Sequence, residues 1–310
     1  MLIRARVLGF CMGVRRAVEM ADAAVAGGAS PIYTLGPLIH NPQVLFSFSQ
    51  RGVKILDLPG SPATGSPATG SYVPGGSFAP GDTVIIRAHG VSPAVEQGLR
   101  DKGAMVIDAT CPRVKTSQNI VFNLAREGYT IFLAGEKDHA EIKGIHGFCL
   151  AGNANCVIVG NPCEAGHIAA ELAGRLGNIP AKTALIGQTT ISEEEYSSIA
   201  GAIKKHFPGL EVKNTICDAT RDRQNALKEL CSAADAIIIA GGKESANTKR
   251  LLSIALGCGK EAWLAETAAD LPPELLNLTK EELAEKKIGI SAGASTPDSV
   301  IDEIEQALLL

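Results

Sequence analysis

The chain has 310 residues, of which 45% are hydrophobic and 20% are charged, and its formal net charge is −4. This length allows two or three domains with an ample core. The slightly acidic balance, with no long basic run, excludes nucleic acid as the expected partner, and no window reaches the ~20 apolar residues of a membrane span. Arg4 and Arg6 break the apolar run at the N-terminus, so we expect a cytoplasmic protein without a signal peptide.

Short apolar runs alternate with segments of helical period along the chain. The predicted strands are residues 32–35, 84–87, 105–107, 131–134, 184–186, 236–240 and 288–291. Apolar positions with helical spacing lie between them, for example Val14, Ala17, Val18 and Ala21, and a closing helix is predicted over 297–308. Such alternation is typical of an α/β fold with mainly parallel sheets and crossover helices.

Residues 59–80 do not follow this pattern. They read PGSPATGSPATGSYVPGGSFAP and contain a direct duplication of SPATG. Gly, Pro and Ser at this density are typical of a flexible surface insertion, which we interpret as an inert loop rather than a functional lid.

Three cysteines share one local context, although they lie about a hundred residues apart. Cys11 follows VLGF and precedes MGVRRAV, Cys111 follows VIDAT and precedes PRVKTSQ, and Cys217 follows KNTI and precedes DATRDRQ. Each ends a strand-like run and begins a helix-like one. The repetition predicts three copies of one α/β unit, each of which presents a thiol to a common centre.

Two polar loops follow each cysteine at matched distances, the first after 28 or 29 residues and the second after a further 49 or 50. In chain order, the loop residues at these positions are His40, His89, His139, Thr189, Ser245 and Ser295. The agreement between these three sets of distances predicts three pseudo-symmetric lobes, over residues 1–110, 111–215 and 216–310. Each lobe is expected to have a small, mainly parallel sheet and flanking helices. Because functional groups gather at the carboxyl ends of parallel strands, we expect these loops to line one central metal-binding cavity.

Three thiolates that converge in one cavity are typical ligands of a metal. The residues leave two interpretations open: a zinc site with a histidine as fourth ligand, or a [4Fe–4S] cluster with one iron open to a substrate. No CxxC spacing accompanies these cysteines to favour either one. A helix N-terminus is expected to lower the pKa of a thiol and so to favour the thiolate that a metal needs.

The other cysteines are not repeated between the lobes and are interpreted as packing residues or free thiols. They are Cys149, Cys156, Cys163, Cys231 and Cys258. Residues 257–262 formally match GxGxxA, but they follow a helix-like segment rather than a strand, so they do not predict a dinucleotide site.

An ordered set of short motifs resembles that of the LytB/IspH family, the 4-hydroxy-3-methylbut-2-enyl diphosphate reductases. The motifs are GFCMGV, LIHN, AHGVS, DATCP, DHAEIKG, GQTT and SAGAS, and they span about residues 5–300. The resemblance implies an oxidoreductase of isoprenoid biosynthesis, at the last step of the methylerythritol phosphate pathway. Its reaction is the reductive dehydroxylation of the substrate to isopentenyl and dimethylallyl diphosphate.

The resemblance also implies the residues of the site. One [4Fe–4S] cluster per chain would be held by Cys11, Cys111 and Cys217. The residues implied for substrate binding are His40, His89, His139, Thr189, Thr190, Ser245, Asn247 and Ser295. A ferredoxin or flavodoxin would supply the two electrons.

Glu141 is the implied proton donor that turns the hydroxyl group of the substrate into departing water. Thr189 is the implied proton relay, with Thr190 as a further candidate, and His139 is placed among the catalytic residues. His139 and Glu141 stand two residues apart on one loop, so both can face the site. Burial beside a cluster should raise the pKa of a carboxyl group, which suits a proton donor at neutral pH.

Three residues depart from the family pattern. Ala246 stands where a second serine is common, Ala140 replaces a proline, and Lys143 stands where an acidic residue is common. We expect these changes to affect the diphosphate affinity and the flexibility of the Glu141 loop rather than the chemistry.

Two other functions are compatible with the residues alone. One is an open-iron dehydratase or isomerase that needs no electrons, and the other is a non-catalytic, zinc-stabilised module that binds anions. Product analysis with and without a reductant separates the first from a reductase. Colour and acid-labile sulfide distinguish the zinc-stabilised module from both iron–sulfur enzymes, because a zinc site has neither.

Overall fold

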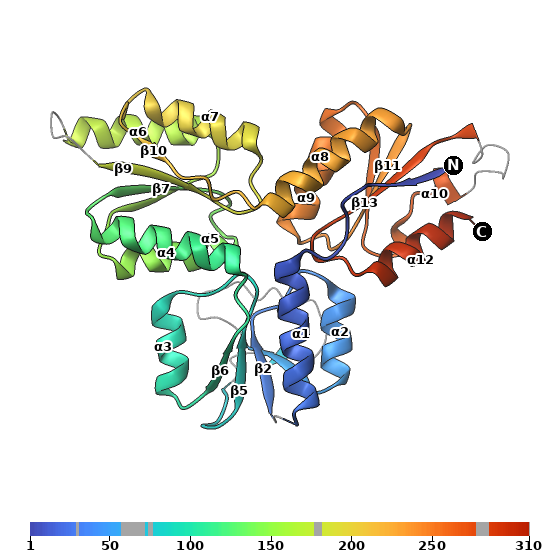
Figure 1. Cartoon of the computed structure of the whole chain (residues 1–310), viewed down its shortest axis with the longest axis horizontal. Helices are drawn as coiled ribbons and strands as arrows, with labels where there is room; N and C mark the ends of the chain where they lie inside the picture. Colours follow the sequence, from blue (N-terminus) through green and yellow to red (C-terminus); the bar gives the residue numbers. More distant parts are fainter. Residues whose placement is uncertain (29–30, 57–71, 74–76, 177–181, 277–284, 310) are drawn as a thin grey trace.

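The computed structural model describes residues 1–28, 31–56, 72–73, 77–176, 182–276 and 285–309. Figure 1 shows three lobes arranged around a centre, with both termini in the third lobe. Each lobe contains one parallel sheet with helices packed against it. The predicted α/β fold with three lobes is confirmed.

The sheet of the first lobe has five parallel strands in the order β4-β3-β2-β5-β6. They are β2 (Ile32–Leu35), β3 (Val53–Leu56), β4 (Tyr72–Val73), β5 (Thr83–Ile86) and β6 (Met105–Asp108). The helices of this lobe are α1 (Met12–Ala26), α2 (Pro42–Gln50) and α3 (Pro93–Asp101). The central strands β2 and β5 are buried throughout, as expected for strands that are covered on both faces.

The second lobe has four parallel strands in the order β10-β9-β7-β8. They are β7 (Thr130–Ala134), β8 (Cys156–Val159), β9 (Thr183–Gly187) and β10 (Glu211–Val212). Its helices are α4 (Pro112–Arg126), α5 (Ala140–Ala151), α6 (Pro162–Leu176) and α7 (Glu193–Lys204). Fully buried side chains such as Phe132, Leu185 and Ile199 form the core between this sheet and its helices.

The third lobe has four parallel strands in the order β1-β13-β11-β12. They are β1 (Leu2–Arg4), β11 (Ala236–Ala240), β12 (Glu261–Ala265) and β13 (Ile288–Ala292). The helical segments are α8 (Asp218–Ala233), α9 (Ala246–Gly257), a 3-10 helix η2 (Ala268–Asp270), α10 (Pro273–Leu276) and α12 (Asp298–Leu309). Because β1 pairs with β13, the N-terminal strand belongs to this sheet although it lies within the range 1–110. The three ranges otherwise remain our proposed division of the chain.

All seven predicted strands are present, and their ends differ from the prediction by at most one residue. The strands that the prediction missed are β1, β3, β4, β8, β10 and β12. Five of these six lie at an edge of a sheet, where one side faces solvent and the apolar run is weaker. The predicted insertion 59–80 falls largely outside the described residues, and its strand β4 pairs in parallel with β3 rather than standing free.

The lobes meet where the loops after the strands reach the centre (Figure 1). Ion pairs join the helices across the lobe boundaries. Arg113 at the start of α4 pairs with Asp218 at the start of α8, and Arg250 on α9 pairs with Glu195 on α7. The start of α4, which follows Cys111, is therefore connected directly to the start of α8, which follows Cys217.

Candidate active site

The three repeated cysteines begin helices in the structure. Cys11, Cys111 and Cys217 are the N-cap residues of α1, α4 and α8, and none of their thiols makes a capping hydrogen bond. Their backbone N–H groups instead donate to carbonyls of the polar loops at 2.9–3.1 Å; the acceptors are Ala294, Ala88 and Thr189, respectively. Each cysteine is thus fixed against a loop that carries a predicted site residue, and its thiol is free to face the cavity.

The three thiols lie close enough to influence one another. An ideal Cβ on Gly13 would come within 2.4 Å of the Cys111 sulfur, so the first turn of α1 packs directly against this thiol. Burial raises the pKa of the Cys111 thiol, and the thiols of Cys11 and Cys217 also raise it, although backbone N–H groups of α4 act in the opposite direction. The N-terminus of α4 therefore lowers the pKa of Cys111 as predicted, but burial outweighs this effect and the net shift is upward. A metal that binds here must displace the thiol proton and stabilise adjacent thiolates.

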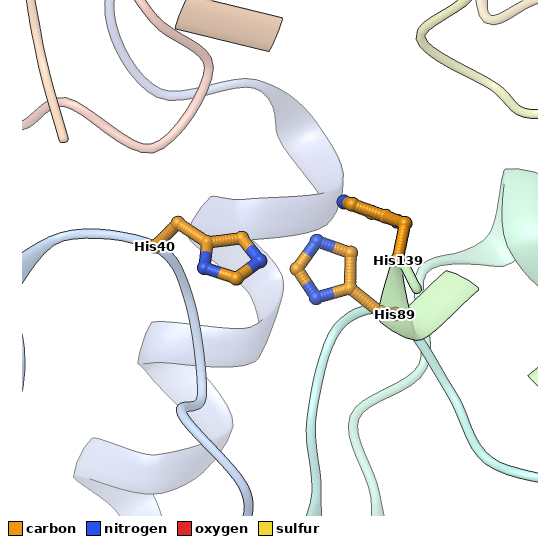
Figure 2. Close-up of side chains that lie close together, drawn as sticks. All are labelled: His40, His89 and His139. Carbon is orange, nitrogen blue, oxygen red and sulfur yellow. The ribbon is translucent and has the colours of Figure 1, made fainter. Parts of the chain in front are cut away.

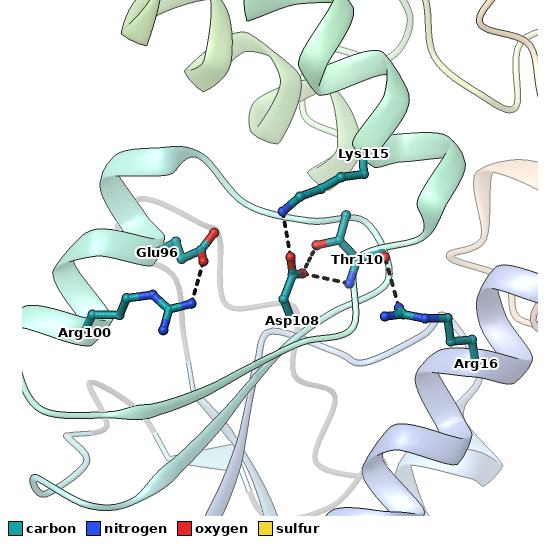
Figure 3. Close-up of polar contacts among 6 residues, drawn as sticks. All are labelled: Arg16, Glu96, Arg100, Asp108, Thr110 and Lys115. Carbon is teal, nitrogen blue, oxygen red and sulfur yellow. Dashed lines mark hydrogen bonds and ion pairs between the residues drawn. The ribbon is translucent and has the colours of Figure 1, made fainter.

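The loop that leads into Cys111 is held by a polar network (Figure 3). The Asp108 carboxylate accepts a hydrogen bond from the Thr110 backbone N–H (3.0 Å) and another from the Thr110 hydroxyl, and it pairs with Lys115 (2.6 Å). Arg16 on α1 donates to the Thr110 carbonyl (3.2 Å). These contacts join β6, α4 and α1, and they set the position of the cysteine that follows.

His40, His89 and His139 form a cluster in which each ring lies close to the other two (Figure 2). The ring centroids are 4.8 to 5.9 Å apart. One nitrogen from each ring lies within 4.8 Å of the others, a spacing that can hold a metal ion. His40 Nε2 and His89 Nδ1 are buried and have no hydrogen-bond partner among the described residues. Unpaired buried nitrogens of this kind indicate a polar ligand.

Desolvation keeps these imidazoles neutral at neutral pH. It lowers the pKa of His40 to about 4, with a further contribution from the Arg87 guanidinium, and it lowers the pKa of His139 to about 3. The pKa of His89 lies well below its usual value for the same reason. At neutral pH the free site therefore carries no imidazolium charge from these three rings. The rings instead offer N–H donors, and His139 Nδ1 accepts the backbone N–H of Glu141 (3.2 Å), which leaves its proton on Nε2.

Glu141 lies in the first turn of α5, and only 1% of its surface is exposed. Its carboxylate accepts hydrogen bonds from the Thr189 backbone N–H (2.6 Å) and from the Thr189 hydroxyl (2.8 Å). Burial raises the pKa of Glu141 to about 7, although both hydrogen bonds lower it. The predicted upward shift is confirmed, so this carboxyl group can hold or release a proton near neutral pH.

Ser245, Asn247 and Ser295 reach the same cavity from the third lobe. The Ser245 hydroxyl caps α9 and accepts the Thr248 backbone N–H (3.3 Å). Both polar atoms of the Asn247 side chain are buried and have no partner among the described residues. Because an unpaired buried amide is costly, Asn247 is placed to bind a polar ligand. Ala246 lines the cavity beside it.

All the predicted site residues line one cavity, which opens in part to solvent. They are Cys11, His40, His89, Cys111, His139, Glu141, Thr189, Thr190, Cys217, Ser245, Asn247 and Ser295. The cavity therefore brings together residues from all three lobes, as the matched spacing predicted.

Three polar residues of the cavity wall were not predicted from the sequence as site residues: Arg113, Thr220 and Arg223. Thr220 and Arg223 are 5% and 2% exposed and lie on α8. Both fall on the same buried stripe of this helix as Leu227 and Leu230. A polar residue on an apolar stripe is the signal that could have found them.

Two of the residues that depart from the family pattern lie outside the cavity wall. Ala140 is the first residue of α5, between His139 and Glu141. Lys143 pairs with the exposed Asp138 at 3.2 Å. Of the three departures, Ala246 is therefore the one placed to contact a bound substrate.

Known proteins resemble this chain along nearly its whole length. The family model described as LytB protein matches residues 2–309. A 4-hydroxy-3-methylbut-2-enyl diphosphate reductase from Treponema denticola is 42% identical over 309 residues, which are 99% of this chain and 98% of the relative. A protein of the same name from Aquifex aeolicus is 39% identical and covers 99% of this chain and 95% of its own length.

Two solved structures share the fold. One is a structure of (E)-4-hydroxy-3-methyl-but-2-enyl diphosphate reductase, described as the terminal enzyme of the non-mevalonate pathway, with 38% identity, a TM-score of 0.66 and coverage of 99% of this chain and 98% of its own. The other, an E-1-hydroxy-2-methyl-but-2-enyl-4-diphosphate reductase from Plasmodium falciparum, has 28% identity, a TM-score of 0.82 and coverage of 99% and 87%. Within the described residues, every helix is too short or too polar to span a membrane.

Proposed function

The chain belongs to the LytB protein family, and we infer that it is a 4-hydroxy-3-methylbut-2-enyl diphosphate reductase, the terminal enzyme of the non-mevalonate pathway. The reaction removes the hydroxyl group of the substrate with two electrons and two protons. It releases water and forms isopentenyl or dimethylallyl diphosphate. The observation that carries this function is that three thiols, three neutral imidazoles and a protonatable glutamate line one cavity.

Cys11, Cys111 and Cys217 are proposed to hold one [4Fe–4S] cluster through their sulfurs. The fit rests on three thiols that face one another at helix N-termini and make no capping hydrogen bonds. A closed zinc site would need a histidine as its fourth ligand, whereas the three imidazoles contact one another. When bound, the cluster would supply electrons and an iron open to the hydroxyl group of the substrate.

The diphosphate of the substrate is proposed to bind between the histidine cluster and the third-lobe loops. The neutral imidazoles and the Asn247 amide have N–H groups to donate, and Ser245 and Ser295 have hydroxyl groups. Unpaired buried atoms of His40, His89 and Asn247 would gain partners in this way. The helices α5 and α9 begin beside these residues, and their N-termini favour an anion.

Glu141 is proposed to donate the proton that converts the hydroxyl group into departing water. A pKa of about 7 means that a large fraction of the carboxyl groups is protonated at neutral pH. The Thr189 hydroxyl lies 2.8 Å from the carboxylate and is placed to relay this proton. The Thr190 hydroxyl is held nearby by the Gln188 amide (3.0 Å) and is a second candidate relay.

The two electrons come from another molecule, and a ferredoxin or flavodoxin is proposed as the donor. Product analysis tests the function: the anaerobically purified protein is incubated with the hydroxy-diphosphate, with and without dithionite and a viologen mediator. We expect five-carbon diphosphate products only with the reductant. Conversion without a reductant would indicate a dehydratase or isomerase, and no conversion in either case would indicate a binding module.

A further inference from the structure

Arg223 is a buried cation at the cysteine end of the cavity. It lies on α8, six residues after Cys217, and only 2% of its surface is exposed. Its guanidinium group donates to the Gly9 carbonyl (2.7 Å) and to the Ala219 carbonyl (3.0 Å). Gly9 stands two residues before Cys11, and Ala219 stands two residues after Cys217. One side chain therefore ties together the segments that carry two of the three thiols.

None of the carboxylates in the described part of the chain pairs with this guanidinium group. Both of its acceptors are neutral carbonyls, its Nε is buried without a partner, and the side chain of the adjacent Asp222 is exposed. Arginine keeps its proton at any pH at which proteins are folded. Because a buried charge is strongly unfavourable unless it is compensated, an anion is expected next to Arg223.

The thiols of Cys11 and Cys217 are the groups that can provide this anion. Both interact favourably with the positive charge of Arg223, more strongly than the exposed Asp222 carboxylate does. A [4Fe–4S] cluster held by three thiolates has a net negative charge, which grows when the cluster takes up an electron. A fixed positive charge beside the cluster therefore favours its reduced form.

We propose that Arg223 is the counter-charge of the three-cysteine centre and raises the reduction potential of the cluster. The inference rests on the proposed cluster and deepens that function. Arg223 is a positioning residue in this account, because it acts through the thiolates and through the Gly9 and Ala219 carbonyls. The hydrogen bonds hold the cysteine segments, and the charge sets how readily the cluster accepts an electron.

The test compares the wild type with Arg223→Gln, Arg223→Lys and Arg221→Gln, all with anaerobically assembled clusters. Arg221 is the matched control, because it lies on the same helix but is already paired with Asp218 (2.7 Å) and Glu193 (3.5 Å). Iron and acid-labile sulfide are measured first. The midpoint potential of the substrate-free enzyme is then read from a redox titration that is monitored by electron paramagnetic resonance.

We expect Arg223→Gln to shift the equilibrium between oxidised and reduced cluster roughly tenfold toward the oxidised form. This shift corresponds to a potential about 59 mV more negative for a one-electron couple. Arg223→Lys should retain most of the wild-type potential because it keeps the charge, and Arg221→Gln should match the wild type.

An intact cluster with the wild-type potential in Arg223→Gln would overturn the inference and leave the proposed function standing. A wild type without a cluster would overturn both. If Arg223→Gln assembles no cluster, Arg223→Lys decides: a cluster in the lysine variant supports the counter-charge role, and its loss in both variants shows that the hydrogen-bond geometry matters instead.

Discussion

The Glu141 carboxylate accepts two hydrogen bonds from one residue, Thr189, through the backbone N–H at 2.6 Å and through the hydroxyl at 2.8 Å. The two residues are 48 positions apart and follow β7 and β9, which are neighbouring strands of one sheet. The Thr189 carbonyl in turn accepts the Cys217 backbone N–H at 3.0 Å. The proposed proton donor, the proposed relay and one proposed cluster ligand are therefore joined by direct contacts.

Replacement of Glu141 by glutamine should remove most of the turnover and leave cluster content and substrate binding intact. The amide keeps the shape of the side chain but cannot deliver the proton, and general acid catalysis contributes roughly 10²–10⁴-fold to a rate. The measurement is kcat together with the substrate Kd. Glu136→Gln is the matched control, because Glu136 lies with an exposed side chain on the loop that leads from β7 into α5. Wild-type turnover in Glu141→Gln would show that another group donates the proton.

The pH dependence of kcat should follow the carboxyl group of Glu141. Because burial raises its pKa to about 7 and the protonated form is the donor, kcat should be constant below this pH and fall as the pH rises above it. The Thr189 hydroxyl stabilises the carboxylate and lowers this pKa. Thr189→Val should therefore move the falling limb about one pH unit toward higher pH, since a hydrogen bond to a charged group contributes about 1.5–3 kcal/mol. If the falling limb of the kcat profile stays at the same pH in Thr189→Val, the titration of Glu141 does not set the pH dependence.

Binding of inorganic diphosphate should take up protons at neutral pH. The free histidines are neutral because desolvation lowers the pKa of His40 to about 4 and that of His139 to about 3, and a bound anion raises both values. Titration calorimetry in buffers with different ionisation enthalpies counts these protons. His40→Asn should take up fewer protons than the wild type, whereas His206→Asn, at an exposed position, should match it. Equal proton uptake in all three proteins would contradict the assignment of His40 to the diphosphate site.

Replacement of Ala246 by serine should tighten diphosphate binding. Ala246 is the first residue of α9 and lines the cavity between Ser245 and Asn247, so a hydroxyl group there adds one donor to the anion site. We expect a Kd that is lower by about three- to tenfold, as one modest hydrogen bond allows. Ala140→Ser is the matched control, because Ala140 is also the first residue of its helix but does not line the cavity. An unchanged or higher Kd in Ala246→Ser would show that the introduced hydroxyl group makes no hydrogen bond to the diphosphate.

The sequence predicted the central strands of the sheets and missed most of the edges. Strands such as β7 and β11 are buried on both faces, so their apolar runs stand out from the surrounding residues. By contrast, β1 is the three-residue segment Leu2–Arg4, and its partner β13 lies almost the whole chain length away. Local patterning carries no information on such a pairing, because it depends on how the two ends of the chain come together in the third lobe.

The residues of the site and the raised pKa of Glu141 could be predicted, but the electrostatics of His40 and Cys111 could not. The repeated offsets and the family motifs placed His40 and Cys111 at the centre, and the structure brings both to one cavity. Their protonation depends on how closely other groups pack around them: burial lowers the pKa of His40 and outweighs the effect of the helix N-terminus at Cys111. Arg223 was missed because one arginine in a charged helical segment resembles a surface residue unless its position on the stripe of Leu227 and Leu230 is noticed.

The metal content of the anaerobically purified protein tests the central claim most directly. We predict about four irons and about four acid-labile sulfides per chain, lost in Cys111→Ser and retained in Cys163→Ser, whose thiol is exposed on α6 away from the cavity. Stoichiometric zinc without sulfide, or an unchanged iron content in Cys111→Ser, would contradict the proposed cluster.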